Sequence, residues 1–330
     1  MNFSLIVCTY MRPMALRNLL NSVNEQTLYP NEIIVVDGSL NDETSRLISH
    51  LNYRHLKYFI VDETNRGLTK QRNFGIKKVS ETSEIICFLD DDIILENDYF
   101  EKLMMTYHIK RAALAVGGYI KNEVIWEKSN NTDNSDKFYF DGWIRDEPSR
   151  FKMRRKFGLL PDTPPGFLPT FAHGRSIGFL PPSGEIYEVE QIMGGVSSYK
   201  KEVFEKLSFS TYFEGYGLYE DADFSLRLAK IGKLYINTDA QLYHHHDEKG
   251  RPNMYKYGKM VIKNGWYVWR VKYPKPSLKA KIKWHATAIL LIVIRLSNIF
   301  NSRQKKQALT ESLGRLLGLF SLIFIKPKIN

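Results

Sequence analysis

Cysteine is scarce in this chain of 330 residues: the two cysteines, Cys8 and Cys87, both lie in strongly apolar stretches. Two buried thiols exclude a disulfide framework, so a reducing compartment is expected. The first ten residues also lack the length and the basic flank of a signal peptide. We therefore expect the protein to act on the cytosolic side.

Acidic residues are almost absent from the C-terminal quarter. From Lys249 onward, 18 lysines and arginines accompany a single acid, Glu311, which gives this segment a net charge of +17. The preceding residues are mildly acidic, at −6. A block of one sign implies a polyanionic neighbour, for which nucleic acid and anionic lipid are the candidates.

Long apolar runs are missing as well. The two runs of the basic segment, 284–294 and 316–325, have 11 and 10 residues, whereas crossing a bilayer takes about 20. Short aliphatic runs between basic residues suit helices that lie in a membrane interface, and they serve lipid better than phosphate. We therefore predict an anionic membrane surface as a partner, no nucleic acid, and a cytoplasmic location peripheral to the inner face of the membrane. The alternative is that both runs are ordinary helices packed on the core.

The first half of the chain alternates buried strands with amphipathic helices. This pattern predicts an α/β fold with a doubly wound, mostly parallel sheet flanked by helices. Ligands bind at the carboxyl ends of such strands, where this chain places Thr9, Tyr10, Asp37 and the acids 90–92. The expected strands are 3–8, 32–36, 55–61 and 85–89, and the expected helices are 17–25, 42–51, 69–79 and 219–231.

Residues 126–190 interrupt this alternation with seven prolines and with clusters of Asn, Asp and Ser. We interpret them as an irregular insertion. The predicted organisation is therefore an α/β domain, 1–247, that contains the insertion, followed by a basic, amphipathic helical region, 248–330, that associates with a membrane.

An acidic triplet, Asp90–Asp91–Asp92, follows the fourth expected strand directly. Three carboxylates at a buried strand end repel one another and therefore require a counter-cation. Oxygen ligands at this density suit Mg²⁺ or Mn²⁺, which would bridge a diphosphate. The alternative is a solvated acidic turn.

Two further groups have side chains suited to catalysis or metal binding. Glu220 and Asp221 begin a helix, where one carboxylate could act as a general base, although the helix dipole alone favours acids in a first turn. In the run 244–246, His244 and His246 would share one face of an extended chain and could bind a metal ion. Histidines that are merely exposed or packed in the core are the alternative.

Taken in order, these segments resemble the family 2 glycosyltransferases, which have the GT-A fold. The resemblance covers residues 3 to 246 and is carried by SLIVCTYMRP, VVDGSLND, NRGLTKQRNFGI, FLDDDIIL, GGVSSYKKEVF and the Glu220–Asp221 pair. One departure is Gly38, which stands where the family has a second Asp. Nucleotidyltransferases have a similar layout but open with a glycine-rich turn, which TYMRPM lacks.

The resemblance implies a glycosyltransferase that uses a nucleotide-sugar donor, with UDP as the expected nucleotide, and a saccharide or lipid-linked acceptor. It implies inversion at the anomeric carbon, with Asp221 as the base, Glu220 beside it, and Asp92 as a ligand of Mn²⁺ or Mg²⁺. The insertion would lie on the acceptor side. A non-catalytic nucleotide-binding membrane adaptor remains the other alternative. The donor-binding residues implied are Thr9, Tyr10, Arg12, Asp37, Gly67, Lys70, Arg72, Asn73, Asp90, Asp91, Gly194 and Gly195.

Overall fold

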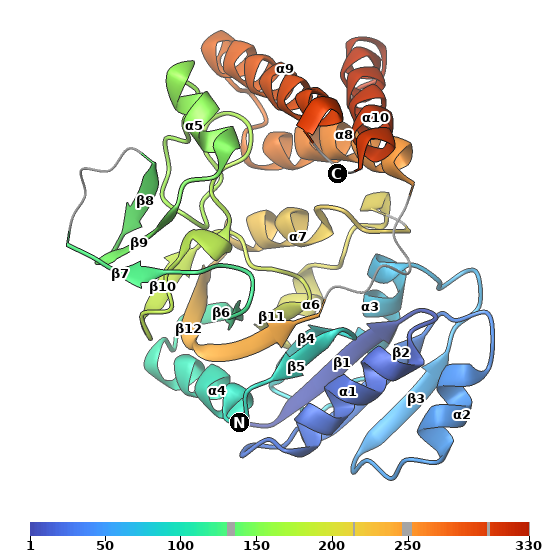
Figure 1. Ribbon diagram of the computed structural model, residues 1–330. Coiled ribbons are helices and arrows are strands. Elements are labelled where there is room, and N and C mark those ends of the chain that lie inside the picture. The colour runs from blue at the N-terminus through green and yellow to red at the C-terminus, as the bar shows by residue number, and fades with distance from the viewer. Residues whose placement is uncertain (131–135, 214, 246–252, 302–303, 330) are drawn as a thin grey trace. The chain divides into compact units, whose positions relative to one another are not determined.

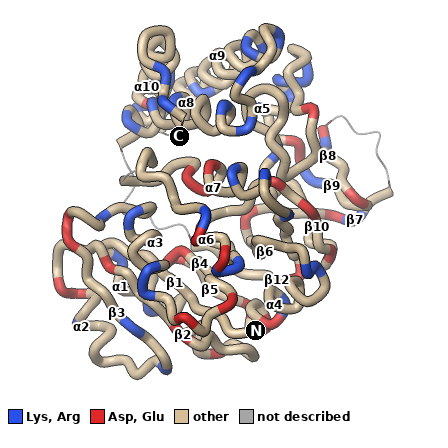
Figure 2. The backbone as a smooth tube through the Cα atoms, turned by 180° about the vertical axis from the view of Figure 1, so that it is seen from behind, with Lys and Arg blue, Asp and Glu red and all other residues tan. Residues whose placement is uncertain are grey.

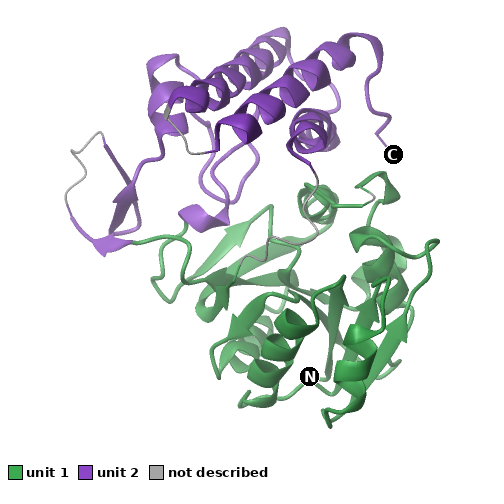
Figure 3. Ribbon diagram, turned by 45° about the vertical axis from the view of Figure 1, so that its right-hand side comes forward, with its two compact units in different colours: residues 1–125, 180–251 green, residues 126–179, 252–330 purple. Residues whose placement is uncertain are grey.

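The computed structural model describes residues 1–130, 136–213, 215–245, 253–301 and 304–329. The chain forms two compact units, residues 1–125 with 180–251 and residues 126–179 with 252–330 (Figure 3). Most of the segment interpreted as an insertion therefore belongs to the same unit as the C-terminal helices.

The first unit is built on a central sheet whose N-terminal half is parallel (Figure 1). The strands lie in the order β3-β2-β1-β4, so the chain reverses its direction of travel across the sheet between β1 and β4. This switch point is where ligands bind in open α/β sheets. The elements are β1 (Phe3–Thr9), α1 (Pro13–Asn24), β2 (Glu32–Asp37), α2 (Glu43–Ser49), β3 (Leu56–Ile60), α3 (Leu68–Ile76) and β4 (Ile85–Asp90).

The other half of the sheet is mixed. Strand β11 (Val196–Lys200) runs antiparallel to both β4 and β6 (Ala113–Ile120), and β12 (Lys233–His244) is parallel to β6. Strand β10 (Ile186–Val189) pairs with β12, so the sheet resumes before residue 190. The remaining elements of this unit are β5 (Ile93–Leu95), α4 (Tyr99–Ile109), α6 (Val203–Lys206), a 3-10 turn (Thr211–Phe213) and α7 (Glu220–Leu228).

Helices cover both faces of the parallel strands, which is why those strands are apolar at every position. Alternate residues of a strand point to opposite faces. Leu5 packs in the cluster that contains Leu16 and Leu19 of α1. On the other face, Ile6 lies against Gly75 of α3, where a Cβ would come within 2.8 Å of the Ile6 side chain. The expected α/β architecture is thus confirmed.

The second unit combines a small sheet with helices. Strands β7 (Glu127–Lys128), β9 (Trp143–Asp146) and β8 (Lys137–Phe140) are antiparallel, so 126–179 is more regular than its composition indicates. Helices α8 and α10 approach closely at glycines, because a Cβ on Gly258 would lie 2.2 Å from the carbonyl oxygen of Glu311. The helices are α5 (Ser149–Lys156), a 3-10 turn (Ile177–Phe179), α8 (Met254–Lys272), α9 (Leu278–Asn301) and α10 (Lys305–Phe324).

Helix α9 is longer than the apolar run that suggested it. Residues Leu278–Phe300 have a mean hydropathy of 1.3 and are long and apolar enough to cross a membrane by length and composition. The difference from the sequence prediction arises because three lysines precede the run but belong to the same helix.

Candidate active site

The three acids at the end of β4 lie in different environments. The carboxylate of Asp91 is buried, where it accepts hydrogen bonds from Thr9 Oγ1 at 2.7 Å and from Arg12 Nη1 at 3.1 Å. Burial raises the pKa of Asp91 to about 7, although both of these partners oppose the shift. Asp91 therefore ties the turn after β1 to the end of β4.

Asp92 is joined to the end of β12. Its carboxylate lies 3.2 Å from His244 Nε2 and 3.4 Å from Arg12 Nη1. Strand pairing explains the meeting, because β5 and β12 place His244 opposite Ile93, the residue after Asp92. The other nitrogen of this ring, His244 Nδ1, lies 3.0 Å from Glu123 Oε1. Burial alone would lower the pKa of His244, but the hydrogen bonds to Asp92 and Glu123 raise it to about 10.

The donor set around Asp92 fits a divalent cation in part. Within the described ranges, no three His, Cys, Asp or Glu side chains form a ready-made metal shell. Asp92 and His244 supply an oxygen and a nitrogen ligand, and a bound diphosphate would supply further oxygens. Asp91, Asp92 and Glu123 share Arg12 and His244 as cationic partners, so negative charge is in excess. His246 lies outside the described residues.

Arg72 connects the two acidic groups of the site. Its guanidinium is buried, forms an ion pair with Glu220 at the start of α7, and lies 3.5 Å from Asp90 Oδ1. Burial raises the pKa of Glu220 to about 8, with Arg72 acting against the shift. Both members of the pair are nearly inaccessible, so Glu220 is committed to Arg72.

Asp221 lies against the segment that precedes β11. Its carboxylate accepts a hydrogen bond from the backbone N–H of Gly194 at 3.3 Å, and the other oxygen accepts from the N–H of Ala222 at 2.8 Å. Burial raises the pKa of Asp221, and these two backbone N–H groups oppose that rise.

Gly194 and Gly195 separate the acids of β4 from those of α7 with no room to spare. A Cβ on Gly195 would lie 2.0 Å from Asp90 Oδ2, and one on Gly194 would lie 2.4 Å from Glu220 Oε1. The N–H of Asp90 also donates to the carbonyl of Gly195 at 3.1 Å. The predicted residues at the ends of β4, β11 and α7 are therefore brought together.

The predicted nucleotide-binding residues surround the turn after β1. Asp37 ends β2, is buried, and accepts a hydrogen bond from the N–H of Ser39 at 2.7 Å. Ser39 Oγ in turn accepts from the N–H of Met11 at 2.8 Å, which links the turn to β2. Tyr10 is exposed in this turn.

The block 65–76 has mixed roles. Gly67 caps α3 with φ +116°, a value that favours glycine, and Lys70 lies in the first turn of that helix. Asn73 instead bonds the backbone of Phe209 twice, at 2.8 and 3.0 Å. Its amide therefore positions the loop before α7.

Two residues of this region were not singled out by the sequence. Gln71 Nε2 donates to the carbonyls of Thr9 and Val36, at 3.1 and 2.9 Å, and so joins α3 to the ends of two strands. Glu123 holds His244. Neither stands at a strand end or in an acidic cluster, so only the fold reveals them.

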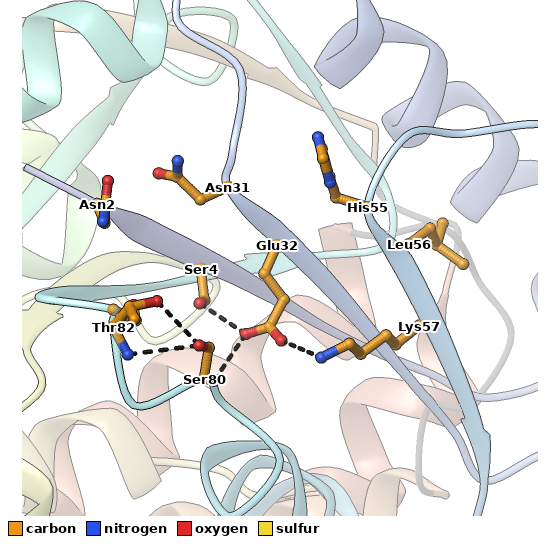
Figure 4. A pocket seen from close by; sticks show the side chains of 10 residues that line it. Asn2, Ser4, Asn31, Glu32, His55, Leu56, Lys57, Ser80 and Thr82 are labelled. Atoms are coloured by element: carbon orange, nitrogen blue, oxygen red, sulfur yellow. Dashed lines mark hydrogen bonds and ion pairs between the residues drawn. The ribbon is translucent and has the colours of Figure 1, made fainter.

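A cavity of about 360 Å³ lies elsewhere, at the amino ends of β1, β2 and β3 (Figure 4). Its central carboxylate, Glu32, is fully engaged by Lys57 Nζ at 2.6 Å, Ser4 Oγ at 2.8 Å and the N–H of Ser80 at 3.0 Å. This end of a parallel sheet is not where its ligands bind. The cavity is therefore a packing feature of the strand ends.

Comparison with solved structures identifies the fold. A crystal structure of GalNAc-T7 with UDP, GalNAc and Mn²⁺ superimposes with a TM-score of 0.52 and 17% identity, over 82% of this chain and 50% of that one. The mixed sheet with acids at its switch point is the GT-A fold of glycosyltransferases. Residues 4–173 match the model of glycosyl transferase family 2, and the chain belongs to that family.

Curated relatives match over their shared N-terminal type of segment. The O-antigen chain rhamnosyltransferase RfbN of Salmonella typhimurium is 30% identical over 104 residues, 32% of each chain. The GalNAc(5)-diNAcBac-PP-undecaprenol beta-1,3-glucosyltransferase of Campylobacter jejuni is 31% identical over 103 residues, 31% of this chain and 33% of that one. The match thus spans about a third of these relatives.

Proposed function

We propose that the protein is a metal-dependent, inverting glycosyltransferase that moves a sugar from a nucleotide diphosphate donor to a hydroxyl group of its acceptor. The observation that carries this proposal is the Gly194–Gly195 segment. It brings the carboxylate of Asp221 and the acids after β4 to one place, without room for a side chain between them. Family membership supports the same reaction class.

In this mechanism Asp221 is the general base. It removes the proton of the acceptor hydroxyl as that oxygen attacks the anomeric carbon from the face opposite the diphosphate. Glu220 is held by Arg72 and serves as a positioning residue. Thr9, Arg12 and Asp37 orient the nucleotide at the carboxyl ends of β1 and β2. Mn²⁺ or Mg²⁺, held by Asp92 and His244, supplies positive charge that stabilises the departing diphosphate.

The substrates follow from the relatives and the family. UDP is the proposed nucleotide, and a saccharide or lipid-linked intermediate of a cell-envelope glycan is the proposed acceptor. The printed names of two relatives, an O-antigen chain transferase and an undecaprenol-linked glucosyltransferase, support this class. We further propose that the protein works at the inner face of the membrane.

A donor panel tests the proposal. Purified protein is incubated with UDP-, dTDP- and GDP-sugars, with and without Mn²⁺, while thermal shift and release of nucleoside diphosphate are recorded. We expect Mn²⁺-dependent stabilisation and slow hydrolysis with one nucleotide class. Formation of a sugar nucleotide from a sugar phosphate and a nucleoside triphosphate would instead identify a nucleotidyltransferase. Binding without any turnover in the presence of acceptor extracts would identify a non-catalytic adaptor.

A further inference from the structure

Helix α9 is apolar on two faces. One face is buried within the second unit, where Ala280, Trp284, Ala288 and Ile292 recur every four residues. Trp284 packs on Trp266 of α8, with ring centroids 4.9 Å apart. A surface helix normally presents polar residues on its other side. The outward stripe of α9 is instead formed by Leu278, Ile282, Ile289, Val293, Leu296 and Phe300, all exposed.

Helix α10 repeats this arrangement. Its small and polar residues Ala308, Ser312 and Gly318 face inward, together with Glu311. The outward side carries large apolar residues at helical spacing, and Phe324 is 84% exposed. The exposed apolar residues of α10 are Leu309, Leu313, Leu317, Phe320, Ile323 and Phe324. Two neighbouring helices thus expose large apolar side chains, an arrangement that marks an interaction surface.

The charge around these stripes has one sign. Lysines lie at the ends of the helices, and the tubes of α8, α9 and α10 in Figure 2 carry blue segments with hardly any red. Glu311, the single acid after Lys249, is buried between Arg295 and Arg315, at 2.7 and 2.6 Å. It therefore adds no negative charge to the surface. The exposed lysines of the two helices and their flanks are Lys275, Lys279, Lys281, Lys305, Lys306, Lys326 and Lys328.

We propose that the outward faces of α9 and α10 bind an anionic lipid surface, with both helices lying in the plane of the interface. Apolar stripes bordered by lysines match acyl chains bordered by anionic headgroups. A membrane-spanning α9 would require lipid on all its sides. Its inner face, however, packs on Trp266, and Lys283 Nζ donates to the carbonyl of Gly158 at 3.2 Å. All residues of the surface lie in the second unit, so the proposal does not depend on the proposed chemistry.

The test is sedimentation of the full-length chain with vesicles of phosphatidylcholine alone or mixed equally with phosphatidylglycerol. We expect binding to the anionic vesicles that weakens as salt is raised. Ile289→Glu should lower the partition coefficient by roughly tenfold or more, because it places a charge in the middle of the apolar stripe. Lys279→Glu with Lys281→Glu should lower it by a similar factor, since each basic residue near the surface adds roughly fivefold.

The matched control is Met105→Glu on α4, because Met105 and Ile289 are both 52% exposed. It should bind vesicles as the unchanged chain does. Near-ultraviolet circular dichroism and donor hydrolysis without lipid report whether each variant is folded. Equal loss of binding in Met105→Glu, or no binding by the unchanged chain, would overturn the proposal.

Two other occupants have distinct signatures. A spanning helix would leave the protein in the membrane after alkaline carbonate extraction and bind neutral vesicles equally well. A second copy of the chain would give a dimer in light scattering that Ile289→Glu dissociates, with no vesicle binding. Either result contradicts an interfacial lipid surface, whereas release by carbonate supports it. Loss of donor hydrolysis with intact vesicle binding would count only against the proposed chemistry.

Discussion

Arg72 and Glu220, which are 148 residues apart in the sequence, form a buried ion pair beneath the candidate active site. The pair engages the first carboxylate of the Glu220–Asp221 motif and leaves the second as the candidate base. The same guanidinium lies 3.5 Å from Asp90, so one side chain positions both the α7 and the β4 acids. The predictions below follow from this division of roles.

Asp221→Asn should lower kcat by roughly 10²- to 10⁴-fold, the contribution typical of a general base, while the Kd for the nucleotide stays unchanged. Steady-state kinetics and calorimetry check both quantities. Because burial raises the pKa of Asp221 and only its ionised form accepts a proton, kcat/KM should rise with pH through a value above that of an ordinary aspartate. Near-normal turnover by the variant would rule out this base.

Arg72→Met should destabilise the fold by about 3–5 kcal/mol, because it leaves the Glu220 carboxylate buried without its cation. Chemical denaturation measures the change. Arg46→Met is the matched control: Arg46 pairs with Asp42 on the surface, both side chains are largely exposed, and no measurable change is expected. Equal stability of the two variants would show that the buried pair is not structural.

Glu123→Gln should weaken Mn²⁺-dependent donor binding by roughly 10- to 100-fold, the effect typical of a group that orients a metal ligand. Asp92→Asn should abolish the dependence on metal, and EDTA should reproduce its effect in the unchanged protein. Titration of Mn²⁺ in the presence of the nucleotide checks all three. If Glu123→Gln titrates like the unchanged protein, His244 does not need Glu123 to bind the metal.

Gly195→Ala should inactivate the enzyme, because its Cβ would meet Asp90 Oδ2 at 2.0 Å and displace either that carboxylate or the loop. Gly178→Ala is the control, since a Cβ there meets nothing closer than 3.6 Å. Donor hydrolysis and thermal unfolding should be recorded together. An active Gly195→Ala variant would contradict the close approach on which the site is built.

The sequence by itself determined the parts of this protein that depend on local pattern. Runs such as 32–36 are apolar at every position because helices cover both faces of the sheet, and their period predicts the strands without knowledge of the neighbours. Since parallel strands end at one edge, the polar residues after β1, β2 and β4 were predicted to meet, and Thr9 and Asp91 do.

Only the tertiary structure decided which partner each of these side chains takes. Asn73 fits a donor-binding motif, yet its amide holds Phe209. Glu123 reaches His244 across 121 residues, and the proline-rich segment joins the C-terminal helices. The physical reason is that hydrophobic period and turn chemistry act over a few residues, whereas hydrogen bonds and ion pairs form between groups that packing alone brings within 3 to 4 Å of each other.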